Sequence, residues 1–104
     1  MNAVTATSTT KQQLWQREAE AFRKIPGMDL LLRSQRETLP DLEVKYPDAA
    51  FARMIADNLF IGDAEQKEIH QKAYLSILNG EAISSVRFQY SRDTEAYLTK
   101  HMWD

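Results

Sequence analysis

Apolar residues recur at helical spacing along most of the chain, with polar residues between them. The first such stripe has spacings of four, three and three: Trp15, Ala19, Phe22 and Ile25. We expect this helix to begin near residues 8–10, where hydroxyl side chains can cap free amides. It should end at Pro26 and Gly27, because proline lacks an amide and glycine permits the turn.

Two further helices are expected before the middle of the chain. One should run over about 28–38, closed by Pro40. The next should run over about 47–59, with Pro47 at its start, where the missing amide costs little. Its stripe follows the i, i+3, i+4, i+7, i+8 pattern: Phe51, Met54, Ile55, Asn58 and Leu59. Gly62 follows the stripe and indicates a stop.

The fourth helix should begin at Asp63. Gln66 lies three positions on, which resembles a capping box with aspartate in place of serine or threonine. The helix carries a broad apolar sector: Ile69, Ala73, Tyr74, Leu75, Ile77 and Leu78. Asn79 and Gly80 are a C-terminal stop. So broad an apolar face favours a central position or contact with a partner.

Two segments show the alternation that is typical of strands. In 42–46 the apolar residues alternate, and the segment is short and lies between two prolines, so an extended connector is the favoured alternative to a strand. In 86–90 the alternation predicts a strand. Ser91 should then cap a short helix over about 92–102. If both segments are strands, they can pair as a small ribbon packed on the helices.

The pattern as a whole predicts a mainly α fold. We expect four to five short helices in a compact bundle, with a minor two-stranded β element (42–46 and 86–90) left open. Residues 1–9 are small and mostly polar and have no helical period, so they are expected to form a disordered N-terminal tail. Residues 10–104 are then a single helical domain.

The amino-acid composition excludes several kinds of chemistry but does not indicate a function. The 104 residues contain no cysteine, which excludes disulfides, thiolate metal sites and a cysteine nucleophile. A net charge of −2 is too balanced to predict a polyanionic partner. The apolar runs are too short to cross a bilayer, and the first ten residues lack the pattern of a signal peptide. We therefore expect no membrane partner and a cytoplasmic location.

No catalytic, cofactor-binding or metal-binding residue is predicted. His70 and His101 have no ligand spacing around them, and His70 is expected to be an exposed helical residue. The three glycines stand singly at helix ends, so no phosphate-binding loop or small-molecule substrate is inferred. Five basic residues in the first two helices leave a basic face open, although interleaved glutamates favour a solvated surface: Arg17, Arg23, Lys24, Arg33 and Arg36.

The order strand, helix, glycine turn, helix over the middle third of the chain resembles the ribbon–helix–helix DNA-binding family. That resemblance implies a dimer whose paired strands enter the major groove. Two departures count against it. Glu43 would face the DNA beside Lys45, and acidic residues over 63–68 would approach phosphates. Nucleic acid is therefore the less favoured partner, and a dimeric DNA-binding regulator of this type is the alternative function.

The favoured prediction is a small non-enzymatic interaction or regulatory protein that acts through a protein–protein surface. Its partner is expected to be another protein or a second copy, as in a homodimer. The candidate surface comprises Tyr74, Leu78, Met102 and Trp103. A large aromatic residue so near the end of the chain either docks on the domain or is presented to a partner, and docking of Trp103 is favoured because exposure to water is costly.

Overall fold

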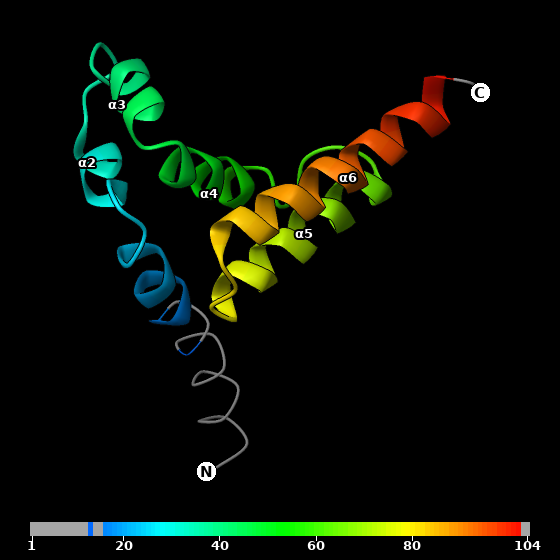
Figure 1. The fold of residues 1–104 in the computed structure, drawn as a ribbon, viewed down its shortest axis with the longest axis horizontal. Coiled ribbons are helices and arrows are strands. Elements are labelled where there is room, and N and C mark those ends of the chain that lie inside the picture. Colours follow the sequence, from blue (N-terminus) through cyan, green and yellow to red (C-terminus); the bar gives the residue numbers. More distant parts are fainter. Residues whose placement is uncertain (1–12, 14–15, 103–104) are drawn as a thin grey trace.

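The computed structural model describes residues 13 and 16–102, and in this part of the chain the fold is mainly helical. Residues 16–23 are helical and precede five labelled helices (Figure 1): α2 (Met28–Arg33), α3 (Leu39–Lys45), α4 (Pro47–Asp57), α5 (Ala64–Leu78) and α6 (Ile83–Met102). The predicted tail, residues 1–9, lies outside the described residues, as do the predicted capping residues 8–10 and Trp15.

The core lies where α4 and α5 meet the N-terminal helices. Ala49, Ala52 and Ile55 of α4 are completely buried. The two alanines let neighbouring helices approach closely, since they have only a methyl group to accommodate. α5 adds four buried residues to the same cluster: Ala73, Tyr74, Ile77 and Leu78. Both helices predicted here contribute to the core, but Ile55 is the one buried residue of the stripe predicted over 51–59, and Leu75 of the predicted sector is 52% exposed.

Capping at both ends of α5 is as the sequence predicts. The Asp63 carboxylate accepts a hydrogen bond from the Gln66 backbone amide at 2.9 Å, and the Gln66 side chain accepts one from the Asp63 amide at 3.0 Å. This reciprocal pair satisfies two amides that the first turn would leave free. At the other end Gly80 has φ of 82°, a left-handed conformation that costs glycine little. The helix therefore begins and ends at predicted positions.

The helix predicted over 28–38 ends early. α2 stops at Arg33, and Ser34 has an extended backbone, with ψ of 152°. The Ser34 hydroxyl donates to the Leu31 carbonyl at 2.8 Å and so competes with continuation of the helix. Before α2, Gly27 has φ of 83°, and a Cβ there would lie 2.1 Å from the ring of Tyr46. Glycine is therefore required where α2 meets the end of α3.

The strand and the connector considered for 42–46 are both wrong, because α3 continues to Lys45. Leu39, Leu42 and Tyr46 are spaced as i, i+3 and i+7, and all three pack against the core. Val44, the middle residue of the apparent alternation, is 85% exposed. Pro40 lies in the first helical turn, where it breaks no intrahelical hydrogen bond. The segment is thus a short amphipathic helix.

The strand predicted over 86–90 is also wrong. It belongs to α6, a single helix of 20 residues, so the short helix expected over about 92–102 begins nine positions earlier, at Ile83. Val86 is 3% exposed and Tyr90, four positions on, packs on the same side. Phe88 lies between them in sequence but is 62% exposed. With both segments helical, no strand occurs among residues 16–102.

α5 and α6 form an antiparallel hairpin, joined by a short turn after Gly80. Figure 1 shows them side by side, with the C-terminal half of α6 extending away from α2, α3 and α4. Ile83, Val86 and Tyr90 face the core at the N-terminal end of α6. None of the helices in the described part of the chain is long and apolar enough to cross a membrane.

Candidate interaction surface

The C-terminal half of α6 is attached to the start of α5 by polar contacts. The Tyr97 hydroxyl donates to the Asp63 carboxylate, which is also the N-cap of α5. Lys100 Nζ donates to Glu65 Oε1 at 2.9 Å, and His101 Nε2 lies 3.5 Å from the same oxygen. These contacts fix the rotation of α6, because they all lie on the side that faces α5.

The same contacts shift the pKa values of the groups involved. The hydrogen bond from Tyr97 lowers the pKa of Asp63, and the Gln66 backbone amide adds to the effect. The hydrogen bond from Lys100 lowers the pKa of Glu65. The bond to Asp63 raises the pKa of Tyr97 to about 12. Each shift follows from a partner that favours one protonation state, so the attachment of α6 depends on pH.

His70 of α5 is half-buried against Tyr90 of α6, so the predicted exposed position is wrong. Its Nδ1 lies 2.7 Å from the Gln66 carbonyl oxygen, which can only accept, so Nδ1 carries a proton. Nε2 lies 3.2 Å from the Tyr90 hydroxyl and can accept from it. Nδ1 is thus bonded within α5, while Nε2 joins α5 to α6. No cluster of three or more potential metal ligands occurs in the part of the chain that the structure describes.

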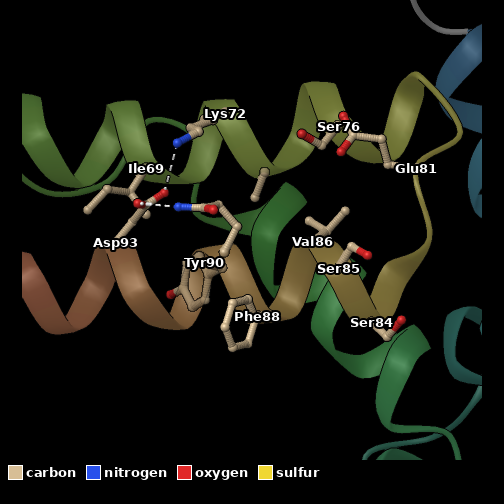
Figure 2. A pocket seen from close by; sticks show the side chains of 12 residues that line it. Ile69, Lys72, Ser76, Glu81, Ser84, Ser85, Val86, Phe88, Tyr90 and Asp93 are labelled. Atoms are coloured by element: carbon tan, nitrogen blue, oxygen red, sulfur yellow. Dashed lines mark hydrogen bonds and ion pairs between the residues drawn. The ribbon is translucent and has the colours of Figure 1, made fainter.

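A hollow of about 640 Å³ lies along the groove between α5 and α6. Figure 2 shows Lys72 and Asp93 joined across it, at 3.2 Å, while Gln89 also donates to Asp93. Ser76, Ser84 and Ser85 line the groove, but its lining contains no histidine. Activation of a serine needs an adjacent base within hydrogen-bonding reach. The groove therefore lacks the serine–histidine pair of a hydrolase.

The face of α6 turned away from α5 carries a solvent-exposed stripe, whose N-terminal residues Ser84 and Phe88 also border the groove. We call it the outer stripe, and its six residues are Ser84, Phe88, Ser91, Glu95, Leu98 and Met102. Its three large apolar side chains are well exposed, at 62% for Phe88, 53% for Leu98 and 78% for Met102. The Phe88 ring points away from α5 in Figure 2, and the Arg92 guanidinium lies 5.7 Å from the ring centroid. The outer stripe therefore presents three apolar side chains, with the Glu95 carboxylate within it and the Arg92 guanidinium beside it.

The three predicted surface residues that the structure describes do not come together. Tyr74 and Leu78 are each only 8% exposed, because they pack against the N-terminal helix. The Tyr74 hydroxyl donates to Glu18 at 2.8 Å, and burial raises the pKa of this phenol. Met102 is exposed on the outer stripe, whereas Trp103 lies outside the described residues. Of the predicted set, Met102 alone is shown on a surface.

The five basic residues of the N-terminal helices do not form one face. Arg17 donates to the Asn79 side chain at 2.8 Å, and Arg33 pairs with Asp29 at 2.9 Å. Arg17 and Lys24 line one hollow, while Arg23 lines another. Arg36 is exposed in the turn before α3. Charges spread in this way do not build a track for a phosphate backbone.

The ribbon–helix–helix alternative loses its recognition strand, because residues 42–45 are helical. A helix at that position cannot pair with a second copy as a β ribbon. Glu43 and Lys45 therefore do not occupy strand positions that could read bases.

Sequence reasoning missed Phe88 and Leu98 as surface residues. Their signal was present: from Ser84 to Met102 the stripe residues are spaced by four, three, four, three and four. This regular spacing becomes visible when 83–102 is taken as one helix. Assigning 86–90 to a strand interrupted it. Phe60 and Ile61, in the connection between α4 and α5, are also exposed, at 79% and 60%.

Comparison with known proteins finds no matching family model, no matching curated protein and no matching solved structure.

Proposed function

We propose that this chain is a non-enzymatic interaction or regulatory protein that binds a protein partner through the outer stripe of α6. The observation that carries the proposal is the exposure of Phe88, Leu98 and Met102 along one face of a well-formed helix. Covering each of these half-exposed side chains would contribute roughly 1 to 2 kcal/mol from apolar burial. A set of such residues at helical spacing is the usual apolar element of helix-mediated recognition.

The attachment of α6 supports the same proposal. Tyr97, Lys100 and His101 hold the opposite side of the helix against α5, so the outer stripe is presented on a preformed element. A preformed helix loses little conformational entropy on binding, and this reduces the cost of association.

The mixed charge beside the stripe favours a protein partner over a polyanion. Arg92 and Glu95 lie on or next to the stripe and carry opposite charges. Such an arrangement orients a partner whose charges are complementary and gives no net attraction to a phosphate backbone.

Site-specific photo-crosslinking in cells tests the proposal. A photo-crosslinking amino acid replaces Thr99, which is exposed beside the stripe, in one version of the full chain, and Val44 in a control version. Val44 is 85% exposed but lies on α3, away from the stripe. We expect a discrete protein adduct from position 99, absent from position 44, and lost when Phe88→Glu is added. No adduct at position 99, or an equal adduct at position 44, would contradict the proposal.

A further inference from the structure

The outer stripe has the spacing of a coiled-coil seam. Its residues alternate four and three positions apart from Ser84 to Met102, which is the heptad pattern of two alternating seam positions. All six are exposed, so no helix in the described part of the chain covers them. The seam extends over about 27 Å at a rise of 1.5 Å per residue. A second helix of similar length is the partner that such a seam fits.

The order of residues makes the seam complementary to itself. We propose that the partner is a second copy of this chain, and that the two α6 helices pair antiparallel through their outer stripes, about a two-fold axis level with Asp93. This inference rests on the proposed function of the same stripe. In this register Phe88 falls opposite Leu98 of the second copy, Ser84 opposite Met102, and Ser91 opposite Glu95. Every seam position thus meets another seam position, as a closed two-fold interface requires.

Charge selects the antiparallel direction. In the antiparallel register the Glu95 carboxylate lies opposite the Ser91 hydroxyl of the second copy, which can donate to it. Arg92 of that copy is one residue further along, about 1.5 Å along the helix axis. A parallel pairing would place the two Glu95 carboxylates against each other, which is unfavourable. The same polar pair fixes the register, because shifting the helices by one heptad would separate Glu95 from both partners.

The shape of the molecule leaves room for this pairing. The stripe is on the side of α6 opposite α5, and the C-terminal half of α6 extends away from α2, α3 and α4 (Figure 1). The contact is a single helix pair with three large apolar residues on each side. Such a small interface predicts a reversible dimer, with a Kd on the order of micromolar or weaker.

Disulfide trapping between engineered cysteines tests the direction and register. The chain has no cysteine, so each introduced thiol reports on one position. One full-length variant carries Phe88→Cys and another Leu98→Cys. Mixed under mild oxidation, they should form the mixed disulfide, since the two positions are opposite. Neither variant alone should crosslink, because like positions would be about 15 Å apart along the axis, beyond the roughly 7 Å that a disulfide tolerates.

Each other trapping result overturns the proposal. Rapid disulfides within each variant alone would show a parallel pairing. A mixed disulfide no faster than that between Val44→Cys chains, which are exposed on α3, would show random collision. Circular dichroism of the reduced variants verifies that α6 is intact. Because the substituted side chains are exposed, the variants should fold.

Sedimentation equilibrium with charge variants supplies an independent test. Arg92→Glu should weaken self-association at least about fivefold, because it places two carboxylates together. The double variant Arg92→Glu, Glu95→Arg should restore it, since opposite charges then meet again. Val44→Glu should leave it unchanged. A dimer that Val44→Glu disrupts, or a double variant as weak as the single one, would contradict the register.

Self-association and binding of a different protein give different results in these experiments. A chain that stays monomeric at millimolar concentration overturns the second copy as the partner. The proposed function then still stands if position 99 crosslinks to a different protein in cells. If neither self-association nor a position-99 adduct occurs, both are contradicted.

Discussion

α5 and α6 lie side by side and are both long, yet they are held in different ways. α5 has four buried residues among 15, whereas α6 has one among 20. Apolar packing therefore fixes α5, while the C-terminal half of α6 is fixed by hydrogen bonds and ion pairs such as that of Lys100 with Glu65. The difference indicates that stability is concentrated around α4 and α5 and that the other face of α6 stays exposed to solvent.

The largest expected effect is a difference in the free energy of unfolding between variants of the core and variants of the outer stripe. Ile55→Ala removes a fully buried side chain, so we expect a loss of about 2 to 5 kcal/mol in the free energy of unfolding. Leu98→Ala, at a site 53% exposed, should cost within about 0.5 kcal/mol. Urea denaturation followed by circular dichroism, at low protein concentration, measures both. Equal losses would contradict the division between the two regions.

A second pair of variants compares a buried and an exposed residue within α6. Val86 is 3% exposed and Phe88 is 62% exposed, two positions apart. Val86→Ala should destabilise the fold by about 1 to 2 kcal/mol, while Phe88→Ala should have little effect, because its ring is already in water. Thermal unfolding of the two variants compares them directly. A greater loss from Phe88→Ala at low concentration would mean that the ring packs on its own chain.

A smaller effect is expected from acid at the end of α6. The folded pKa values of Asp63 and Glu65 lie below their ordinary values of 3.8 and 4.5. Their contribution is therefore present above those values and is lost as pH falls through the lower folded pKa values. The protection of backbone amides after Tyr97 against hydrogen exchange, relative to the intrinsic rate at each pH, should fall below about pH 4, before that of α4. Tyr97→Phe should weaken this dependence, and simultaneous loss of both regions would contradict it.

At alkaline pH the contact between Tyr97 and Asp63 should lose stability as pH rises, the opposite direction to the acid effect. Its folded pKa of about 12 is above the ordinary value of 10.0, so its contribution is present below 10.0 and lost as pH rises through about 12. An ultraviolet titration of the tyrosines should show that one late phase disappears in Asp63→Asn, which keeps a capping group but no charge. An unchanged titration would contradict the Tyr97–Asp63 contact.

Sequence periodicity predicted the core helices well and failed at two short segments for one physical reason. In both 42–46 and 86–90, residues spaced by four lie on the inner face of a helix, and an exposed apolar residue happens to stand between them. The exposed residue is Val44 in one segment and Phe88 in the other. Alternation over five positions cannot distinguish this arrangement from a strand.

The surface was harder to predict than the core. Tyr74 and Leu78 were chosen because their sector is broad, but that breadth reflects packing on three sides: against the N-terminal helix, α4 and α6. Which neighbours cover a helix depends on tertiary contacts that one sequence does not contain. Met102 was predicted because it lies near the end of its segment, and Phe88 was missed because it was assigned to a strand.

The outer stripe, and not the exposed apolar residues of α2 and α3, is the surface through which we propose that this chain meets its partner. Methyl NMR spectra recorded over a range of protein concentration test it most directly. The methyl signals of Leu98 and Met102 should shift as concentration rises, while those of Leu32 and Val44 stay in place. Shifts at Leu32 and Val44 with none at Leu98 and Met102 would contradict it.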